Sequence, residues 1–441
     1  MSAHAYSQRH PNERIDLGTF PLPVRVPFYD TDNDARPLKW TVTQTFSPSP
    51  RLELSATDAI SVDNVFRAIV DTEAKYSLDI LGCEPVLLTL DMCSCEGVTL
   101  AANVIPCQLF PPTNRLSKAS FCVFNWPPFR PQPDTAAGIL ATFAVNDWLV
   151  DVSTLPAIEE RIKALGKSGG YIMTHTATVR KTGGEDFSSQ ELDSLANGLH
   201  NFFSFALGKW SGPQFLTATD RDNQLRYFTA GIGKLSDGAN TLGSSWVDAH
   251  HIEIIKNVAP GFMELISVAP WQDTLGDVIY FYVNANSLGR GVNVDTSALF
   301  TQAALELLAW TYCVHDRKLV LEDMFRKSSF SAADQIRLLC RSLGVPLDIP
   351  PELTDLQQGI LKPNDPRDLA SALTRLRQLV THPGKRDNLK PLAFLQGWEA
   401  AQWLIELIIL RLSNYRGKYA KRFASRYVGA VEDVPWAAGH D

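Results

Sequence analysis

Apolar and polar positions follow two periodicities along the 441-residue chain, and each periodicity predicts a different secondary structure. Up to about residue 165 the apolar runs are short, partly alternating and separated by Pro, Asn and Asp, as in "PVLLTLDMCSCEGVTLAANVIPCQLF" and "ASFCVFNWPPF". Such runs suit pleated strands, whose successive side chains point to opposite faces. We therefore expect a β-rich, sandwich-like domain at 1–165.

The segment 166–292 contains both helix-like and strand-like patterns. Ser188 and Glu191 have the spacing of a capping box at the start of "SSQELDSLANGLHNFFSFALGKW". The apolar residues that recur there at helical spacing are Leu192, Leu195, Leu199, Phe202 and Ala206. Strand-like runs return in "QLRYFTAGI" and "DVIYFYVNANSL". This mixture predicts an α+β domain.

From 293 onward the pattern is helical. The first expected helix has Asp295 or Ser297 as a possible cap. Its apolar face consists of Leu299, Ala303, Leu307 and Trp310. A second helix is predicted over "SAADQIRLLCRSL", with a start signal at Ser331 and a stop signal at Gly344.

Two further helices complete the predicted C-terminal domain. Asp365 and Pro366 have the residue types of a helix start before "RDLASALTRLRQLVTH". A long closing helix is expected over 392–414. Four helices with one long connection predict an all-α bundle at 293–430, followed by a tail at 431–441. The fold class expected for the whole chain is multidomain α+β.

Composition places the chain among folded proteins rather than general nucleic-acid binders. Hydrophobic residues make up 45% and charged residues 20%, which is ordinary for a globular protein, and the net charge is −7. Charge is uneven, however, because no Asp or Glu occurs between Leu407 and Val431, where several basic residues gather. Such a local patch can attract phosphate in an acidic chain.

The sequence predicts a cytoplasmic protein without membrane contact. Its N-terminus lacks the apolar run of a secretory signal. The most apolar stretch, "AAQWLIELIILRL", is interrupted by Gln402, Glu406 and Arg411, so we expect a buried helix there. Seven cysteines in a chain of this length do not suggest a disulfide framework.

Familiar cofactor and metal motifs are incomplete. "RIKALGKSGG" has Arg161 where a phosphate-binding loop needs glycine, which favours a surface turn. "YDTDNDAR" has Ala35 and Thr41 at the glycine and glutamate positions of a calcium loop. "MCSCEG" has no second Cys or His pair nearby for zinc. We predict no cofactor and no metal.

The segment "RLRQLVTHPGKR" holds the strongest candidate for chemistry. Arg377 and His382 are separated by four residues near the end of the third predicted helix of the bundle. A histidine, with an ordinary pKa of about 6.5, exchanges protons at neutral pH, and a guanidinium stabilises charge on a phosphate. An ordinary helix end with the same residues is the more frequent arrangement, because arginines there favourably meet the helix dipole.

The C-terminal region resembles the HEPN superfamily, and within it the Apea-like branch. The resemblance covers about 293–430 and rests on four segments in order: "ALFTQAALELLAW", "QIRLLCRSLGVPLDIPPEL", "RLRQLVTHP" and "EAAQWLIELIILRLSNYRGKYAKR". The family's mark is an arginine, four to six residues and a histidine at the end of the third helix. Arg377 and His382 match it, with Gln378 where many active relatives carry Asn, Asp or His.

The resemblance implies a homodimer with a composite ribonuclease site at its two-fold interface. His382 is implied to act on the 2′-hydroxyl as acid or base, Arg377 to stabilise the transition state, and Gln378 to lie beside them. The residues expected to guide the RNA backbone are Lys385, Arg386, Arg416, Lys418, Lys421 and Arg422.

The expected function is therefore metal-independent RNA cleavage by an effector, plausible in bacterial antiviral defence. Residues 1–292 would then sense an unknown trigger ligand or protein. Two alternatives stay open: a catalytically silent HEPN protein that binds RNA or dimerises, and a β-sandwich recognition protein with a structural helical bundle. Cleavage would require Arg377 and His382 to face each other across a dimer, whereas RNA binding alone would need only an exposed basic patch. In a structural bundle both side chains would be buried or bonded to their own helix ends.

Overall fold

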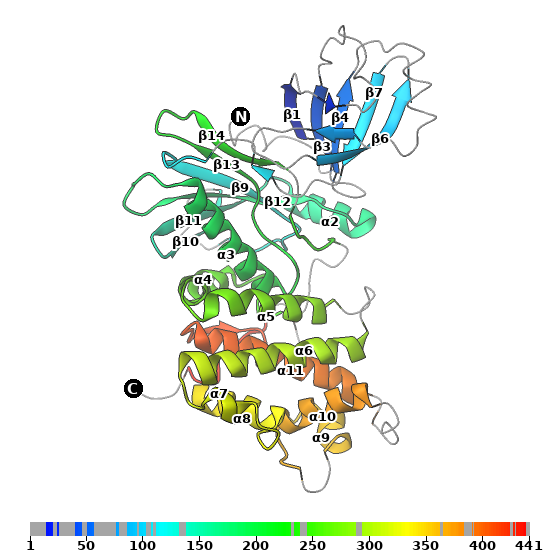
Figure 1. The fold of residues 1–441 in the computed structure, drawn as a ribbon, viewed down its shortest axis with the longest axis vertical. Coiled ribbons are helices and arrows are strands. Elements are labelled where there is room, and N and C mark those ends of the chain that lie inside the picture. Colours follow the sequence, from blue (N-terminus) through cyan, green and yellow to red (C-terminus); the bar gives the residue numbers. More distant parts are fainter. Residues whose placement is uncertain are drawn as a thin grey trace. The chain divides into compact units, whose positions relative to one another are not determined.

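A computed structural model describes the strands within the first 111 residues and most of the chain after them. The later described residues are 112–131, 138–230, 233–238, 245–287, 293–361, 365–382, 390, 392–423, 427 and 429–437. They confirm a multidomain α+β protein, with antiparallel sheets first and helices in the C-terminal half (Figure 1).

The chain forms two compact units, each assembled from three stretches of sequence. The first comprises Met1–Pro128, Val152–Ser194 and Pro213–Thr241. The second comprises Phe129–Asp151, Leu195–Gly212 and Leu242–Asp441.

The first sheet has seven antiparallel strands in the order β1-β3-β4-β7-β6-β5-β2. The bounds are β1 Ile15–Phe20, β2 Val24–Arg25, β3 Trp40–Thr45, β4 Arg51–Ala56, β5 Tyr76–Leu78, β6 Val86–Ser94 and β7 Gly97–Ala102. In its centre, Leu54 of β4 is opposite Leu100 of β7. The strands expected in this region are confirmed, whereas the aspartates of the "YDTDNDAR" motif lie outside the described residues.

The second sheet also has seven strands, in the order β10-β11-β12-β9-β13-β14-β8. The bounds are β8 Cys107–Gln108, β9 Lys118–Phe124, β10 Ile139–Val145, β11 Trp148–Thr154, β12 Met173–Lys181, β13 Gln214–Thr219 and β14 Leu225–Ala230. Phe121 and Val123 of β9, with Ala177 and Val179 of β12, are buried at its centre.

Two helices accompany the strands of the middle region. Helix α3, Ser189–Leu207, begins with the predicted capping box: Ser188 Oγ accepts from the Glu191 N–H at 3.1 Å, and Glu191 Oε2 accepts from the Ser188 N–H at 2.8 Å. The surface turn expected in "RIKALGKSGG" was wrong. Most of that motif forms helix α2, Ile158–Ser168, which ends at Gly169 with a φ of 64°.

The strand expected in "DVIYFYVNANSL" was also wrong. These residues belong mostly to helix α5, Trp271–Ala285, which follows helix α4, Ile252–Ser267. The buried residues of α5 include Leu275, Val278, Ile279, Tyr282 and Val283. Their spacing of three and four residues is helical, and burial along this face overrides the strand preference of Val, Ile and Tyr.

The C-terminal helices are present in the predicted order. The bounds are α6 Val294–Trp310, η2 Thr311–Asp316 (a π-helical segment), α7 Glu322–Phe325, α8 Ala332–Leu343, α9 Thr354–Gly359, α10 Leu369–Thr381 and α11 Ala393–Leu412. A short strand pair, β15 Lys418–Tyr419 and β16 Glu432–Asp433, follows. Within the second compact unit, α4 and α5 lie on one side of α6 and α11, and α8 to α10 lie on the other (Figure 1).

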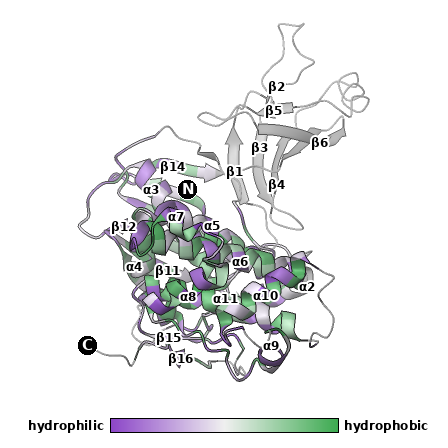
Figure 2. Ribbon diagram, turned by 60° about the horizontal axis from the view of Figure 1, so that its bottom comes forward, coloured by the Kyte–Doolittle hydropathy of each residue, from purple (hydrophilic) through white to green (hydrophobic). Residues whose placement is uncertain are grey.

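The helix starts and the buried face of α6 differ in part from expectation. Ser331 caps α8 as predicted, but Asn293 caps α6 and Asp368 caps α10. The apolar face predicted for α6 was wrong as its buried side: Leu299 is 38% exposed, and Ala303, Leu307 and Trp310 are only partly covered. The buried apolar residues are Ala298, Ala304, Leu305, Leu308 and Ala309 instead. The helix contacts α5, α8, α10 and α11, so its buried surface is broad and includes polar side chains such as Gln302. Hydrophobic residues are abundant in α6 and α11 (Figure 2).

Candidate functional site

Helix α10 carries the Arg-His pair and is fixed by its apolar face. Its buried residues are Leu369, Ala370, Ala372, Leu373, Leu376 and Leu379. They recur at helical spacing and face α6, α8 and α11, with which α10 is in contact. Arg375, Arg377 and Gln378 occupy the remaining sides of the helix, so burial of the leucines determines where these polar side chains lie.

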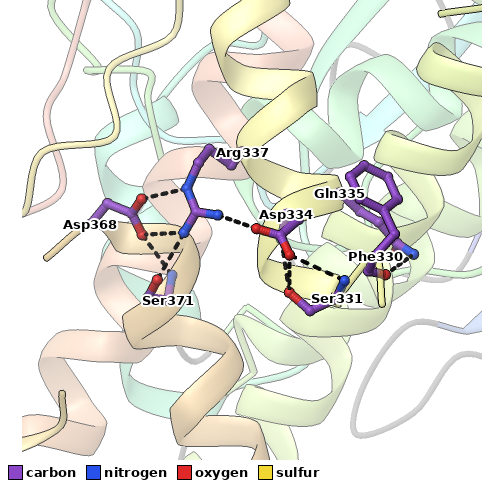
Figure 3. Close-up of polar contacts among 7 residues, drawn as sticks. All are labelled: Phe330, Ser331, Asp334, Gln335, Arg337, Asp368 and Ser371. Carbon is purple, nitrogen blue, oxygen red and sulfur yellow. Dashed lines mark hydrogen bonds and ion pairs between the residues drawn. The ribbon is translucent and has the colours of Figure 1, made fainter. Parts of the chain in front are cut away.

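A second anchor is a polar network between α8 and the start of α10 (Figure 3). Arg337 Nε donates to Asp368 Oδ2 at 2.7 Å, and Arg337 Nη2 donates to Asp368 Oδ1 at 3.2 Å. Nη2 also donates to Ser371 Oγ at 2.9 Å, while Nη1 donates to Asp334 at 2.5 Å. Asp368 Oδ1 in turn accepts from the Ser371 N–H at 2.8 Å. Asp368, which caps α10, is thus held by two hydrogen bonds from the Arg337 guanidinium.

The network changes the proton affinity of Asp368. Burial alone would raise the pKa of this carboxyl group, but hydrogen bonds from Arg337 and Ser371 outweigh burial and lower its pKa. A lowered pKa in the folded state means that the charged form stabilises the fold. This contribution is present above the ordinary aspartate pKa of about 3.9 and is lost as the pH falls through the lower folded-state value.

We predict that Asp368→Ala lowers the free energy of unfolding by about 2–3 kcal/mol at pH 7, because it removes a helix cap and a charged hydrogen-bond partner. The deficit relative to wild type should shrink below about pH 4, where protonation of Asp368 begins to weaken the same contacts. Urea unfolding at several pH values measures this difference. The exposed Asp348 provides the matched control, Asp348→Ala. A deficit independent of pH would contradict a role for the charge.

Arg377 and His382 are both exposed at the end of α10. Among the described residues, neither side chain has a hydrogen-bond or ion-pair partner. The His382 N–H donates to the Gln378 carbonyl oxygen at 2.9 Å, which ends the helix, and its imidazole is not used for this. The structural-bundle alternative required these side chains to be buried or bonded to their own helix ends. Within the described part of the chain they are exposed and not bonded in this way.

Gln378 is exposed, and its side chain has one partner among the described residues. Arg375 Nη1 donates to Gln378 Oε1 at 3.3 Å, over one helical turn. Arg375 Nε is buried and has no acceptor among the residues that the structure describes. The signal in the sequence for this contact is the spacing of three residues between Arg375 and Gln378, which places both side chains on one side of a helix.

The expected RNA-guiding residues divide into different environments. Arg416 and Lys418 are exposed. Lys421 is mostly covered, and its Nζ lies 3.0 Å from Glu352 Oε1. Lys385 and Arg386 lie outside the described residues.

Arg422 requires a correction, because it is buried in the second unit rather than part of a basic surface. Its guanidinium forms an ion pair with Glu406 at 2.7 Å, and the two side chains are 1% and 0% exposed. Arg422 Nη1 donates to Asn286 Oδ1 at 3.0 Å, and Nη2 donates to the Tyr282 hydroxyl at 3.1 Å. Tyr282 donates to Glu406 Oε1 at 2.6 Å. The signal in the sequence was a glutamate within the apolar run "WLIELIIL", because a buried carboxylate needs a buried cation as partner.

This buried cluster shifts the pKa values of its members. Burial raises the pKa of Tyr282 well above its ordinary value, and the neighbouring Glu406 carboxylate adds to the rise. Burial alone would lower the pKa of Arg422, but Glu406 reverses this, and the pKa of Arg422 is raised. Arg422 therefore stays charged and acts as a structural tie between α5, α11 and the segment after α11.

The described residues offer few features of a metal site, a membrane span or a reactive cysteine. In that part of the chain, no group of three or more His, Cys, Asp and Glu side chains is arranged to hold a metal ion. No described helix is both long and apolar enough to cross a membrane. Cys122, Cys313 and Cys340 are buried free thiols.

Comparison with known proteins relates the middle and the C-terminal regions of the chain to the domains of YopA. Residues 111–230 match the YopA central domain family, and residues 269–433 match the YopA C-terminal domain family. A relative is the SPbeta prophage-derived uncharacterized protein YopA of Bacillus subtilis strain 168, which is 26% identical over 277 residues. The match covers 62% of this chain and 60% of the relative. No solved structure matches the chain. The chain is thus similar to YopA in its middle and C-terminal regions, including α5 and the segment that carries Arg422.

Proposed function

We propose that the chain is a metal-independent endoribonuclease of HEPN type that acts in the cytoplasm as a homodimer. The observation that supports this best is the exposure of Arg377 and His382 at the end of α10, without partners among the described residues. A charged guanidinium and a titratable imidazole that are free of internal contacts are available to a substrate phosphate.

The proposed reaction uses the 2′-hydroxyl of the RNA itself. A histidine removes the 2′-hydroxyl proton, and the 2′-oxygen attacks the adjacent phosphorus. The bond from phosphorus to the 5′-oxygen breaks, and this oxygen takes up a proton. Arg377 stabilises the additional negative charge on the phosphoryl oxygens. The products are a 2′,3′-cyclic phosphate and a 5′-hydroxyl.

The helix geometry favours a site shared by two protomers. Arg377 lies within α10, whereas His382 is the first residue beyond it, with a φ of −129° and a ψ of 73°, so helical spacing does not stack the two side chains of one protomer. Two copies related by a two-fold axis would contribute two arginines and two histidines to one phosphate. One histidine can then act as base while the other acts as acid.

The biological setting is proposed from the relatives. The related YopA is named as derived from a prophage, which is in keeping with a role in conflict between phage and bacterial host. Residues 1–292 would then receive the trigger, and the C-terminal helices would act on RNA.

A second candidate is a silent HEPN protein that binds RNA without cleaving it. The bond from Arg375 to Gln378 Oε1 favours this candidate, because it engages the amide at the position that is often Asn, Asp or His in active relatives. Exposed Arg416 and Lys418 would serve binding equally well.

The test is cleavage by purified wild type in the presence of EDTA, with dimerisation followed by light scattering. We expect cleavage of an RNA oligonucleotide, cyclic phosphate ends, and no cleavage of the fully 2′-O-methylated oligonucleotide. Cleavage of the methylated strand would contradict attack by the 2′-oxygen. Tight binding of both strands without cleavage would favour the silent RNA binder.

A further inference from the structure

The side of α10 that leads to His382 carries a different arginine from the one in the Arg-His motif. Arg375 and Gln378 are three residues apart, so they lie on the same side of α10, while Arg377 is only two residues from Arg375 and lies on another side. His382 is the first residue beyond the helix, with a φ of −129° and a ψ of 73°, and its N–H donates to the Gln378 carbonyl oxygen at 2.9 Å. Within one protomer, Arg375, Gln378 and His382 therefore follow one another toward the C-terminal end of α10, and we call these three residues the stripe.

The contacts along this stripe orient Arg375. Gln378 Oε1 accepts from Arg375 Nη1 at 3.3 Å, which fixes one edge of the guanidinium. Nε is buried and, in the described part of the chain, has no acceptor. A guanidinium has five N–H donors and binds phosphate best through two of them at once. Rotation of this edge toward a phosphate would satisfy a donor that now lacks a partner.

The charge of the stripe also suits an anion. No Asp or Glu occurs from Leu369 to His382. Asp368, the nearest acidic residue of α10, is at the opposite end and is already held by Arg337. Arg375 therefore has no acidic partner on its own helix.

We propose that Arg375, Gln378 and His382 form a phosphate-binding face for the RNA backbone, distinct from the side of α10 that carries Arg377. The ligand is a phosphodiester. Arg375 binds it, Gln378 orients Arg375, and His382 lies where the bound strand reaches the reacting atoms. The inference rests on the proposed function for its choice of RNA, but phosphate binding by Arg375 does not require catalysis.

The experiment measures binding of a fully 2′-O-methylated single strand, which cannot be cleaved, to full-length protein at several salt concentrations. For Arg375→Ala we expect Kd to rise about tenfold, which corresponds to the loss of one charged contact. The slope of log K against log salt should become shallower by about 0.7, because one phosphate contact is lost. Arg375→Lys should keep the slope and lose part of the affinity, since lysine retains the charge without the two-pronged geometry.

The matched control is Arg367→Ala, which removes an exposed arginine just before α10. A salt slope unchanged in Arg375→Ala, or a change in Kd equal to that of the control, overturns the inference. Absence of wild-type binding to the strand also overturns it. If wild type binds the strand and Arg375→Ala shows the shallower salt slope, the phosphate-binding face is supported. If the same wild-type protein does not cleave unmodified RNA, only the nuclease proposal fails. Circular dichroism of each variant separates lost contacts from lost helix.

Discussion

Arg377→Ala and His382→Ala are each expected to lower EDTA-resistant RNA cleavage by about 100-fold or more. Removal of a general acid or base typically costs about 10²–10⁴ in rate, and removal of a group that stabilises transition-state charge costs about 10²–10³. Both side chains are exposed, so their removal should leave the melting temperature and the dimer unchanged. The measurement is the initial rate on a labelled RNA, with folding checked by circular dichroism.

The composite site allows a sharper version of this experiment. Mixed dimers that combine Arg377→Ala in one protomer with His382→Ala in the other keep one intact arginine and one intact histidine. They should recover part of the activity that each variant lacks alone, because the groups come from different chains. Arg367→Ala serves as a control for loss of a nearby exposed arginine. Equal cleavage by wild type and both single variants would contradict the assignment of the site.

Arg422→Ala is expected to lower the free energy of unfolding by about 3–5 kcal/mol, because it leaves the Glu406 carboxylate buried without its cation. Burial of an unpaired charge costs more than the lost contact itself. The Tyr282 hydroxyl would also lose the Arg422 donor at 3.1 Å. Chemical denaturation, followed by tryptophan fluorescence and by circular dichroism, measures the change.

The control for this variant is Arg416→Ala, which removes an exposed arginine from the same segment and should change stability by less than about 0.5 kcal/mol. Replacement of both charges, in Glu406→Gln with Arg422→Met, should cost less than Arg422→Ala alone, since no unpaired charge then remains. An Arg422→Ala protein as stable as the Arg416→Ala protein would show that the ion pair contributes nothing.

Local signals in the sequence identified several elements correctly because they need no knowledge of the rest of the fold. The capping boxes at Ser188 and Ser331 are satisfied by residues three positions along, so spacing alone predicts α3 and the start of α8. Gly344, with a φ of 69°, ends α8 in the left-handed conformation that glycine adopts readily. The position of Arg377 and His382 at the end of a helix was predictable for the same reason.

Contacts between distant segments could not be predicted from the sequence. Arg422 seemed part of a basic surface because its acidic partner, Glu406, is one of the few charged residues of α11 and lies on its buried side. The strand expected in "DVIYFYVNANSL" failed because its apolar residues are compatible with both periods, and only packing selects the helix. The cap of α10 was predicted three residues too early, at Asp365, because Asp365 with Pro366 and Asp368 both have the residue types of a helix start; the contact with Arg337 that holds Asp368 comes from another helix.

The buried cluster of Arg422, Glu406, Tyr282 and Asn286 also determines where a fragment that contains only the C-terminal region can begin. The hydroxyl of Tyr282 and the amide of Asn286 belong to the part of the chain before α6, while Glu406 lies in α11. In the same way, Trp398 Nε1 donates to the Ala285 carbonyl oxygen at 2.8 Å. A fragment that begins at Asn293 would retain the Arg-His pair but expose the aromatic and charged interior that α5 covers. Expression trials of the helical half should therefore begin upstream of α4, even when α10 is the only element of interest.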